Sequence, residues 1–425
     1  MSLWHNRDFL KLWAGDAVSD MGNQITQLAL PLIAVLTLDA SPAELGFLGA
    51  AQFAPVLLFG LVAGVWVDRL RRRPLMIAAD LSRALCIGSV PLLAALDQLT
   101  ITYLCLVAFV FGTLSLFFDI AYQSFLPSLV RRDQLVEGNS KLSATGTVAE
   151  VAGPAAGGWI VHALSAPVAL VFDAVSFLAS AIGLSIIKTR EPVPVAASAE
   201  RDLRRELVEG LSFVTRHKLL RIIAGTTATS NFFGRILFTG YTIYLVRELD
   251  LSAGVIGVTF ACASVGSVIG VFLAERCARR AGLGRAIVWS ILIGNAALLL
   301  IPAAGSLGLL TVPTLVIGMF IWGMANPVYN INQVSLRQAI TPERLLGRMN
   351  ASMRFLVWGT VPLGFLAGGA LGSLLGVWPA LLIGAVGGLV PAVWTLPSAL
   401  MALREQPDPS EDEMDESAPS LAGAA

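Results

Sequence analysis

The stretch "GVWVDRLRRRP", residues 64–74, places one acid and four arginines between two long apolar runs. The chain has 425 residues, of which 56% are hydrophobic and only 14% are charged, and its net charge is zero. A water-soluble domain could not bury so much apolar surface, so the solvent of most of this chain must be lipid. The stretch is therefore a short polar connection between two membrane-spanning helices.

Twelve apolar runs are long enough to span a bilayer, because about 20 residues of helix cross the hydrocarbon layer. Six precede a polar interval, at residues 13–38, 43–67, 75–96, 101–126, 140–164 and 167–187. Six follow it, at residues 219–246, 253–275, 285–304, 311–336, 346–374 and 377–400. The pattern predicts an all-α membrane protein whose twelve transmembrane helices form two pseudo-symmetric six-helix bundles.

This reading divides the chain into an N-terminal bundle (1–187), a linker (188–218), a C-terminal bundle (219–403) and an acidic tail (404–425). We expect the tail to be disordered and cytoplasmic, because it is rich in acids and carries prolines. Within the linker, one helical stripe predicts a short amphipathic helix on the inner membrane surface. The stripe consists of Leu203, Leu207, Leu211 and Val214.

Basic residues indicate the orientation of the spans. They precede the first span and follow every second span, whereas Arg247 is the one basic residue in the other connections. Basic loops stay in the cytoplasm, which places both termini there. We expect the protein to lie in the cell inner (plasma) membrane. A cleaved signal peptide is not expected, because the first apolar run contains Asp16 and Asp20.

The second half of the sequence repeats features of the first. Gly60-xxx-Gly64 returns as Gly266-xxx-Gly270, Gly157-Gly158 returns as Gly368-Gly369, and Asn139 aligns with Asn350. Similar composition could produce chance matches, but three matches in register favour a true repeat. Two six-helix halves of the same orientation are typical of secondary transporters that have a substrate path between the halves.

The opening stretch resembles the Gly-x-x-x-Asp-Arg-x-Gly-Arg-[Lys/Arg] signature of the major facilitator superfamily. The matching residues are Gly64, Asp68, Arg69, Arg72 and Arg73, while Arg71 stands where the second glycine is usual, a departure that bears on the tight turn of this loop. The resemblance implies a conformational latch that ties the second span to the eleventh and holds the outward-facing state. The alternative is that these arginines only enforce topology.

The fifth span contains "GPAAGG", with Gly153, Pro154, Gly157 and Gly158. It resembles the antiporter motif of drug exporters, and "LPSLVRRDQLVEGNS" and "AITPERLLGRMN" resemble the macrolide-efflux and enterobactin-exporter branch of drug:proton antiporters. The resemblance implies that these glycines form a seal that limits proton leak. Close helix packing alone is the alternative, since small residues let helices approach.

Ionisable residues inside membrane spans are costly and usually face a cavity or a partner. Glu150 and Arg235 lie closest to mid-membrane in opposite halves, and Glu150 is the first candidate for a proton site. Arg83 and Asp119 lie at similar depth, which favours a structural salt bridge over a transport role. Asp16 and Asp173 lie near span ends, where we expect solvation. The proton or substrate candidates are Glu150, Arg235, Asp20, Asp119 and Arg83.

Four polar residues of the tenth span have two possible roles, lining the path or bonding to neighbouring helices; they are Asn326, Asn330, Asn332 and Gln333.

The sequence as a whole predicts secondary active export of a small amphipathic organic compound (a drug, antibiotic or siderophore) by proton antiport through alternating access. The partners are then a small-molecule substrate, protons and the lipid bilayer. We expect a monomer with no cofactor, no metal site and no nucleic-acid partner.

Three alternatives to export remain. One is proton-coupled metabolite uptake, and another is a non-transporting sensor or scaffold, which is expected to lack the mid-membrane Glu150 and Arg235. The third is a membrane enzyme, which is disfavoured because the sequence has no nucleophile–base pair or metal cluster at the span ends. No GxxxxGK[ST] loop is present, so ATP is not the direct energy source.

Overall fold

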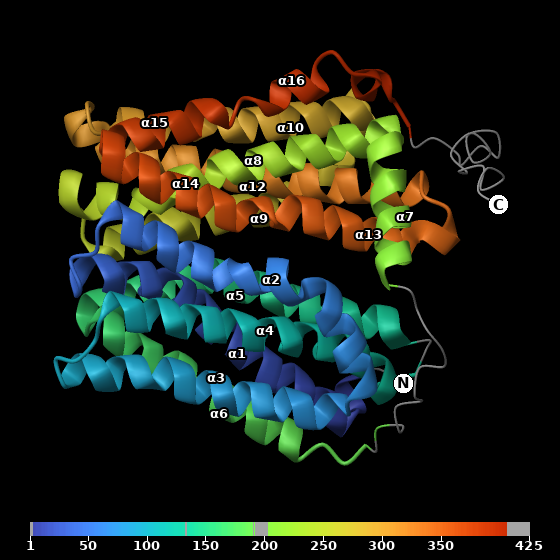
Figure 1. Ribbon diagram of the computed structural model, residues 1–425, viewed down its shortest axis with the longest axis horizontal. Helices are drawn as coiled ribbons and strands as arrows, with labels where there is room; N and C mark the ends of the chain where they lie inside the picture. The colour runs from blue at the N-terminus through green and yellow to red at the C-terminus, as the bar shows by residue number, and fades with distance from the viewer. Residues whose placement is uncertain (1–2, 132–133, 190, 192–202, 406–425) are drawn as a thin grey trace.

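The helices form two bundles that lie side by side (Figure 1). The computed structural model describes residues 3–131, 134–189, 191 and 203–405, so the predicted disorder of residues 406–425 lies outside the described residues. A short 3-10 helix, η1 (Leu3–His5), precedes the N-terminal bundle. The helices of that bundle are α1 (Arg7–Leu36), α2 (Pro42–Arg69), α3 (Arg72–Ala95), α4 (Ile101–Leu129), α5 (Leu135–Ala163) and α6 (Ala166–Ser185).

The second bundle supplies the other six spans, several of them in two pieces. Its helical segments are α8 (Lys218–Ile243) with the π-helix η3 (Tyr244–Glu248), α9 (Ala253–Ala281), α10 (Leu283–Ala297) with α11 (Leu300–Ala304), η4 (Gly308–Leu310) with α12 (Thr311–Ala339), α13 (Glu343–Trp358) with α14 (Thr360–Leu375), and α15 (Val377–Gly387) with α16 (Pro391–Thr395) and η5 (Ala399–Ala402). The breaks after α10, α13 and α15 lie four or five residues before Pro302, Pro362 and Pro391. Proline has no N–H for the carbonyl four residues earlier, so the helix is weakened there.

The twelve predicted spans are all helical, but they differ in apolarity. Nine helical segments of the described chain are long and apolar enough to cross a membrane, and α1, α5 and α8 are the spans not among them. The sequence predicted these three as apolar runs like the others, and the surroundings of these helices in the bundles explain their lower hydropathy.

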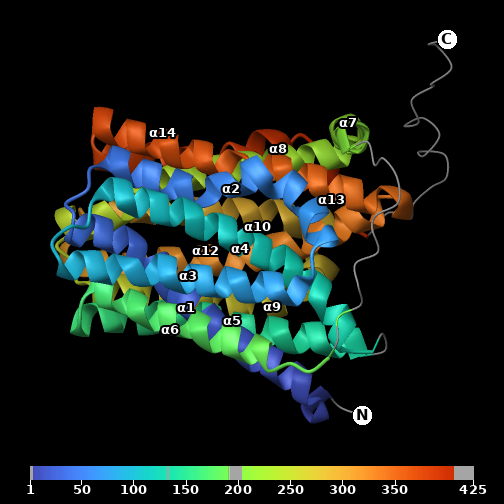
Figure 2. The same cartoon turned by 60° about the horizontal axis from the view of Figure 1, so that its bottom comes forward.

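The start of α1 and the end of α6 lie together, as an even number of crossings requires. The carboxylate of Asp8 accepts hydrogen bonds from the backbone N–H groups of Lys188 (3.0 Å) and Thr189 (2.9 Å). Helix α7 (Leu203–Arg216) lies at the same end of the molecule (Figure 1, Figure 2). We call this the α7 end and the opposite one the distal end.

The linker contains the helix α7, and Val214 of the predicted stripe lies on its buried side. Phe213 and Val214 are buried in a core of the C-terminal bundle, whereas Leu211 is 39% exposed. Helix α7 packs against α13, where Gly210 lies against the backbone of Arg348, and the placement of the stripe on the inner membrane surface stays a prediction. The side chains of Leu203 and Leu207 lie outside the described part of the chain.

The two bundles meet through two equivalent helix pairs, α5 with α9 and α2 with α14. At the first, Gly158 lies against Gly257, and at the second, Gly369 lies against Gly46. The preceding glycine of each pair packs inside its own bundle, with Gly157 against α1 and Gly368 against α8. The repeat read from the sequence is therefore also a repeat of contacts.

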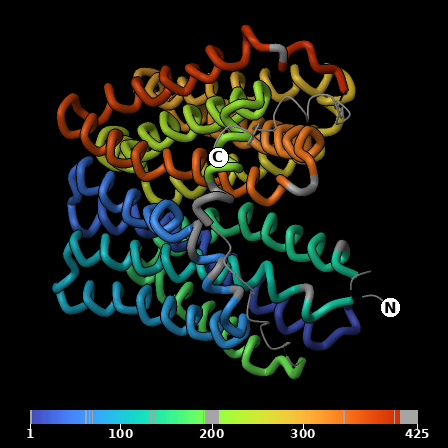
Figure 3. Tube along the Cα trace, turned by 45° about the vertical axis from the view of Figure 1, so that its right-hand side comes forward, coloured from blue at the N-terminus to red at the C-terminus, as the bar shows by residue number. Residues whose placement is uncertain are grey.

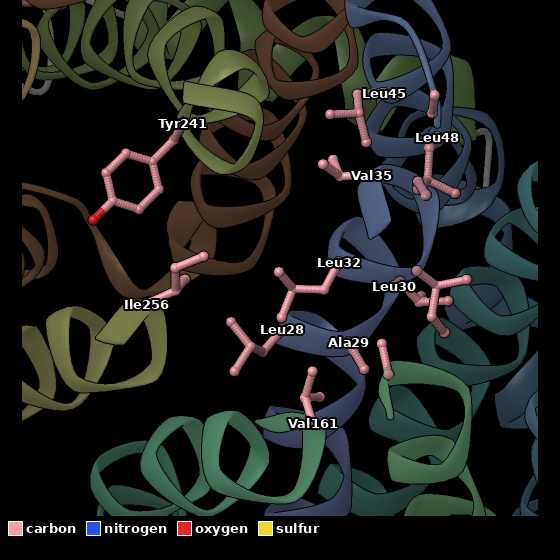
Figure 4. Close-up of a cluster of buried hydrophobic side chains, with 14 of the residues drawn as sticks. Leu28, Ala29, Leu30, Leu32, Val35, Leu45, Leu48, Val161, Tyr241 and Ile256 are labelled. Carbon is pink, nitrogen blue, oxygen red and sulfur yellow. The ribbon is translucent and has the colours of Figure 1, made fainter. Parts of the chain in front are cut away.

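The hydrophobic cores show which end of the molecule is closed. At the distal end, one core joins both bundles, with Leu28, Leu32 and Val161 from the first and Tyr241 and Ile256 from the second (Figure 4). Toward the α7 end, the described residues form two further cores, and each belongs to one bundle alone. Figure 3, with the α7 end turned toward the viewer, shows the two bundles as separate sets of helices. The halves are thus sealed together at the distal end.

Candidate functional site

A cavity of about 650 Å³, here called the central cavity, lies between the two bundles. It is lined by α1, α2 and α5 on one side and by α8, α9, α10, α12, α13 and α14 on the other. Its size is that of a pocket for a drug-sized ligand. The three less apolar spans α1, α5 and α8 are all in its wall, so their lower hydropathy reflects the polar side chains that they direct into the cavity.

Glu150 and Arg235 both line the central cavity, from α5 and α8 respectively. Glu150 is exposed to this space, and Arg235 is half-buried. Among the residues that the structure describes, neither one has an ion-pair partner within 4.0 Å. The structure thus brings the two mid-membrane charges into one cavity without pairing them, and their roles stay a prediction.

The guanidinium of Arg235 lies beside two stacked aromatic rings. Its Cζ is 5.4 Å from the ring centroid of Phe53 and 5.5 Å from that of Phe365. The rings lie 5.7 Å apart at an interplanar angle of 15°, with Phe53 on α2 and Phe365 on α14. Gly364 brings α14 close to α8, since an added Cβ there would lie 2.8 Å from the Cβ of Arg235. Arg235 is therefore held where the two bundles meet.

The polar residues of α12 divide between the two predicted roles. Asn326 and Asn330 line the central cavity. Asn332 instead donates hydrogen bonds to the carbonyl oxygens of Ala274 (3.1 Å) and Val328 (2.8 Å). Gln333 is buried and donates to the Oδ1 atom of Asn330 at 3.0 Å. Two of the four side chains thus face the path, and the other two support the wall behind it.

The glycines of α5 serve two different contacts. Gly153 lies against Gln24 of α1, and Gly157 lies against Ile25, so both allow close packing inside the N-terminal bundle. Gly158 faces outward, where an added Cβ would lie 2.7 Å from the Cα of Gly257 on α9. Pro154 lines the central cavity one turn after Glu150. Close packing thus accounts for the glycines structurally, and a seal against proton leak stays a prediction.

A second cavity, of about 330 Å³, lies inside the N-terminal bundle among α1, α3, α4 and α5. Three carboxylates line it, those of Asp16, Asp20 and Asp119, together with the buried Arg83. The ion pair of Arg83 is with Asp80, one turn earlier on α3, and its guanidinium lies 4.1 Å from the ring centroid of Phe118. The structure therefore places Arg83 and Asp119 in one cavity but gives Arg83 a different partner from the one predicted.

The expectation that Asp173 is solvated was wrong. Asp173 is completely buried, where it accepts hydrogen bonds from the hydroxyls of Thr26 and Ser176. The reason is that α6 packs along α1, which covers the middle of α6 from the bilayer and from water. Asp16 is half-buried and accepts a hydrogen bond of 2.7 Å from the Tyr122 hydroxyl.

The loop between α2 and α3 closes without a glycine at its turn. Leu70 (φ −106°) and Arg71 (φ −69°) have extended backbones, so Arg71 meets no conformational penalty where the family usually has glycine. The carboxylate of Glu191 accepts hydrogen bonds from the backbone N–H groups of Arg72 (2.8 Å) and Arg73 (3.2 Å). This arrangement caps the start of α3.

The structure describes some of the other signature residues of this loop, but not the side chain on which the predicted latch depends. Arg69 is exposed, and an added Cβ at Gly64 would meet no described atom within 4 Å. The side chain of Asp68 lies outside the described part of the structure. The latch therefore stays a prediction.

Several residues around these sites were not singled out from the sequence. Asp80 could have been recognised, because it precedes Arg83 by three residues and so shares its helix face. Phe53 and Phe365 give no such signal, since they come from different bundles and meet only after folding. Glu191 is also a tertiary contact, from beyond the end of α6 to the start of α3.

Two parallel six-helix bundles with a cavity between them are the architecture of a class of secondary membrane transporters. The sequence profile of the Major Facilitator Superfamily matches residues 12–359, and the chain belongs to this family. It is a multi-pass membrane transporter, and such transporters bind small molecules.

The chain is similar to one efflux pump over most of its length and to another over about half of it. "Multidrug efflux pump Tap" of Mycolicibacterium fortuitum is 26% identical over 393 residues, which are 87% of this chain and 92% of that protein. "Macrolide efflux protein A" of Streptococcus pyogenes is 24% identical over 210 residues, 49% of this chain and 52% of that protein. A crystal structure of a bacterial homologue of the iron transporter ferroportin in an inward-facing state has a TM-score of 0.70 at 19% identity, covering 93% of this chain and all of that one. The resemblance to the efflux branch of the family is confirmed.

Proposed function

We propose that this protein exports a small amphipathic organic compound from the cytoplasm by proton antiport. The observation that carries the proposal is the central cavity, whose described lining includes one carboxylate, Glu150 on α5, and one guanidinium, Arg235 on α8. The similarity to efflux pumps supports export as the direction. The same polar cavity argues against a scaffold, which has no need to maintain costly charges at this depth.

The orientation follows from the basic residues that gather in the loops of the α7 end. With that end in the cytoplasm and both termini there, the distal end faces outward. Because the distal end is sealed by a core that both bundles share, the described state is inward-facing. The opposite state requires this seal to open while the α7 end closes, which is the rocking motion of two-bundle transporters.

Glu150 is our proposed proton-binding residue. A carboxylate at this depth is tolerated when it is protonated, paired or facing water, and these conditions alternate as the cavity opens to one side and then the other. Glu150 lies one turn before Pro154, on the same face of α5. Protonation from outside and release to the cytoplasm would then accompany each outward passage of substrate.

The test uses everted vesicles and proteoliposomes containing the purified protein, supplied with a panel of cationic, neutral and anionic amphipathic compounds. Wild type is expected to move protons in response to at least one compound. Glu150→Gln mimics the protonated form, so it should still exchange that compound down its gradient while proton movement is lost. Glu275→Gln, at an exposed carboxylate on α9, is the matched control and should behave as wild type. Wild-type proton movement by Glu150→Gln would remove Glu150 from this role.

A further inference from the structure

Arg235 is a cation that the central cavity keeps without a counter-ion. It is the one basic residue in the described lining of this cavity, and no described carboxylate lies within 4.0 Å of it. A charge held inside a membrane protein is costly, and where it has no structural partner it marks a ligand or ion pathway. The rings of Phe53 and Phe365 offset part of this cost by cation–π attraction, which is weaker than a desolvated ion pair. The side chain of Arg235 is therefore available to bind an anion in the cavity.

The surroundings of Arg235 indicate the rest of the ligand. The rings of Phe53 and Phe365 are stacked, and the ring centroid of Trp358 lies 6.4 Å from that of Phe53. One part of the cavity wall is therefore aromatic. All three side chains line the central cavity. A flat ring system could extend this stack while its anionic group reached the guanidinium. The amides of Gln24, Gln27 and Gln52 line the same cavity and can donate further hydrogen bonds.

We propose that the transported compound is an organic anion, a carboxylate attached to a flat apolar ring system. The guanidinium of Arg235 binds the carboxylate, since its planar fork of donors fits the two oxygens. The aromatic wall takes the ring. This inference rests on the proposed transport function and adds the class of substrate. It also separates the two charges of the cavity by role, with Arg235 binding substrate and Glu150 carrying the proton.

The test is equilibrium binding to the purified full-length protein in detergent, without any proton gradient. The probes are radiolabelled 2-naphthoate and 2-naphthylmethylamine, which share a ring system and carry opposite charges. Wild type is expected to bind the naphthoate at least tenfold more tightly than the amine, because only the carboxylate can make the charge-assisted bidentate contact with the guanidinium. This comparison needs no variant, so a folding defect cannot obscure it.

Variants then assign the preference to Arg235. Arg235→Gln should lose the preference for naphthoate, while Arg235→Lys should keep part of it, because lysine retains the charge without the planar fork. Arg276→Gln, at the α7 end of α9, is the matched control and should bind as wild type. Preference of wild type for the amine, binding of neither probe, or wild-type naphthoate affinity in Arg235→Gln would each overturn the inference. A protein that prefers naphthoate but moves no protons would instead refute the antiport alone.

Discussion

The crossing of α5 and α9 offers a direct way to shift the balance between transport states. In the described state, an alanine at Gly158 would place its Cβ 2.7 Å from the Cα of Gly257 and 3.1 Å from the carbonyl oxygen of Ala253. Carbon atoms in contact lie about 3.5–4.0 Å apart, so the helices must separate by roughly 1 Å. Overpacking of this kind costs about 1–3 kcal/mol. In the proposed outward-facing state the helices part at this end, so Gly158→Ala should favour that state by about 5- to 150-fold.

Electron–electron distance measurements can detect this shift. Spin labels at Gln98→Cys and Leu309→Cys report on the two bundles at the distal end, in a background where the four native cysteines are replaced. Gly158→Ala should increase the population with the longer distance. Gly60→Ala is the control, because its Cβ would meet its nearest atom, Cγ1 of Val56, at an ordinary 3.9 Å. An unchanged distance distribution in well-folded Gly158→Ala would refute the reasoning.

Two further predictions concern charged groups at opposite ends. At the distal end, Arg247 bonds to Asp39 at 2.6 Å across the two bundles, but the Asp39 side chain is 93% exposed, so the pair is worth at most about 1 kcal/mol. Asp39→Asn and Arg247→Gln should each raise the outward-facing population up to about fivefold. If the free-energy changes of the two single variants simply add in the double variant, the two side chains do not pair directly. At the α7 end, burial opposes ionisation of Asp8, but hydrogen bonds from Lys11 and Thr189 outweigh it and lower the pKa to about 2. The stabilising contribution of Asp8 is therefore present above about pH 4 and is lost as the pH falls toward 2. The melting temperatures of wild type and Asp8→Asn should differ at pH 6 and converge near pH 2, with Asp97→Asn as the exposed control. A difference in melting temperature that stays constant with pH would contradict this linkage.

The helices and their order could be predicted because length, apolarity and flanking charge are local properties of the chain. Close approach of helices at glycines such as Gly158 and Gly369 could be predicted as well, although the glycines alone do not say which helix each one meets. What the sequence could not supply is helix rotation. Asp173 and Glu150 are each the one acid of a predicted span (167–187 and 140–164), yet Asp173 is fully buried against α1 and Glu150 faces the central cavity.

The site was only partly predictable for the same reason. Arg235 stood out as a charge in an apolar span, but its meaning depends on Phe53 and Phe365, which come from different bundles. Their stack exists only in the assembled interface, and nothing in either local sequence points to it. The partner of Arg83 was misassigned because depth along the membrane was compared between helices, while the true partner, Asp80, lies on the same helix.

The shared core at the distal end has a thermodynamic consequence. Closing this end removes aliphatic and aromatic side chains from water, whereas the loops at the α7 end are rich in arginine. Burial of apolar surface lowers the heat capacity, and its free energy weakens on cooling. The inward-facing state should therefore have the lower heat capacity of the two, and its share of the population should fall as the temperature is lowered. At low temperature the proposed transport cycle should therefore spend more of its time with the central cavity turned outward.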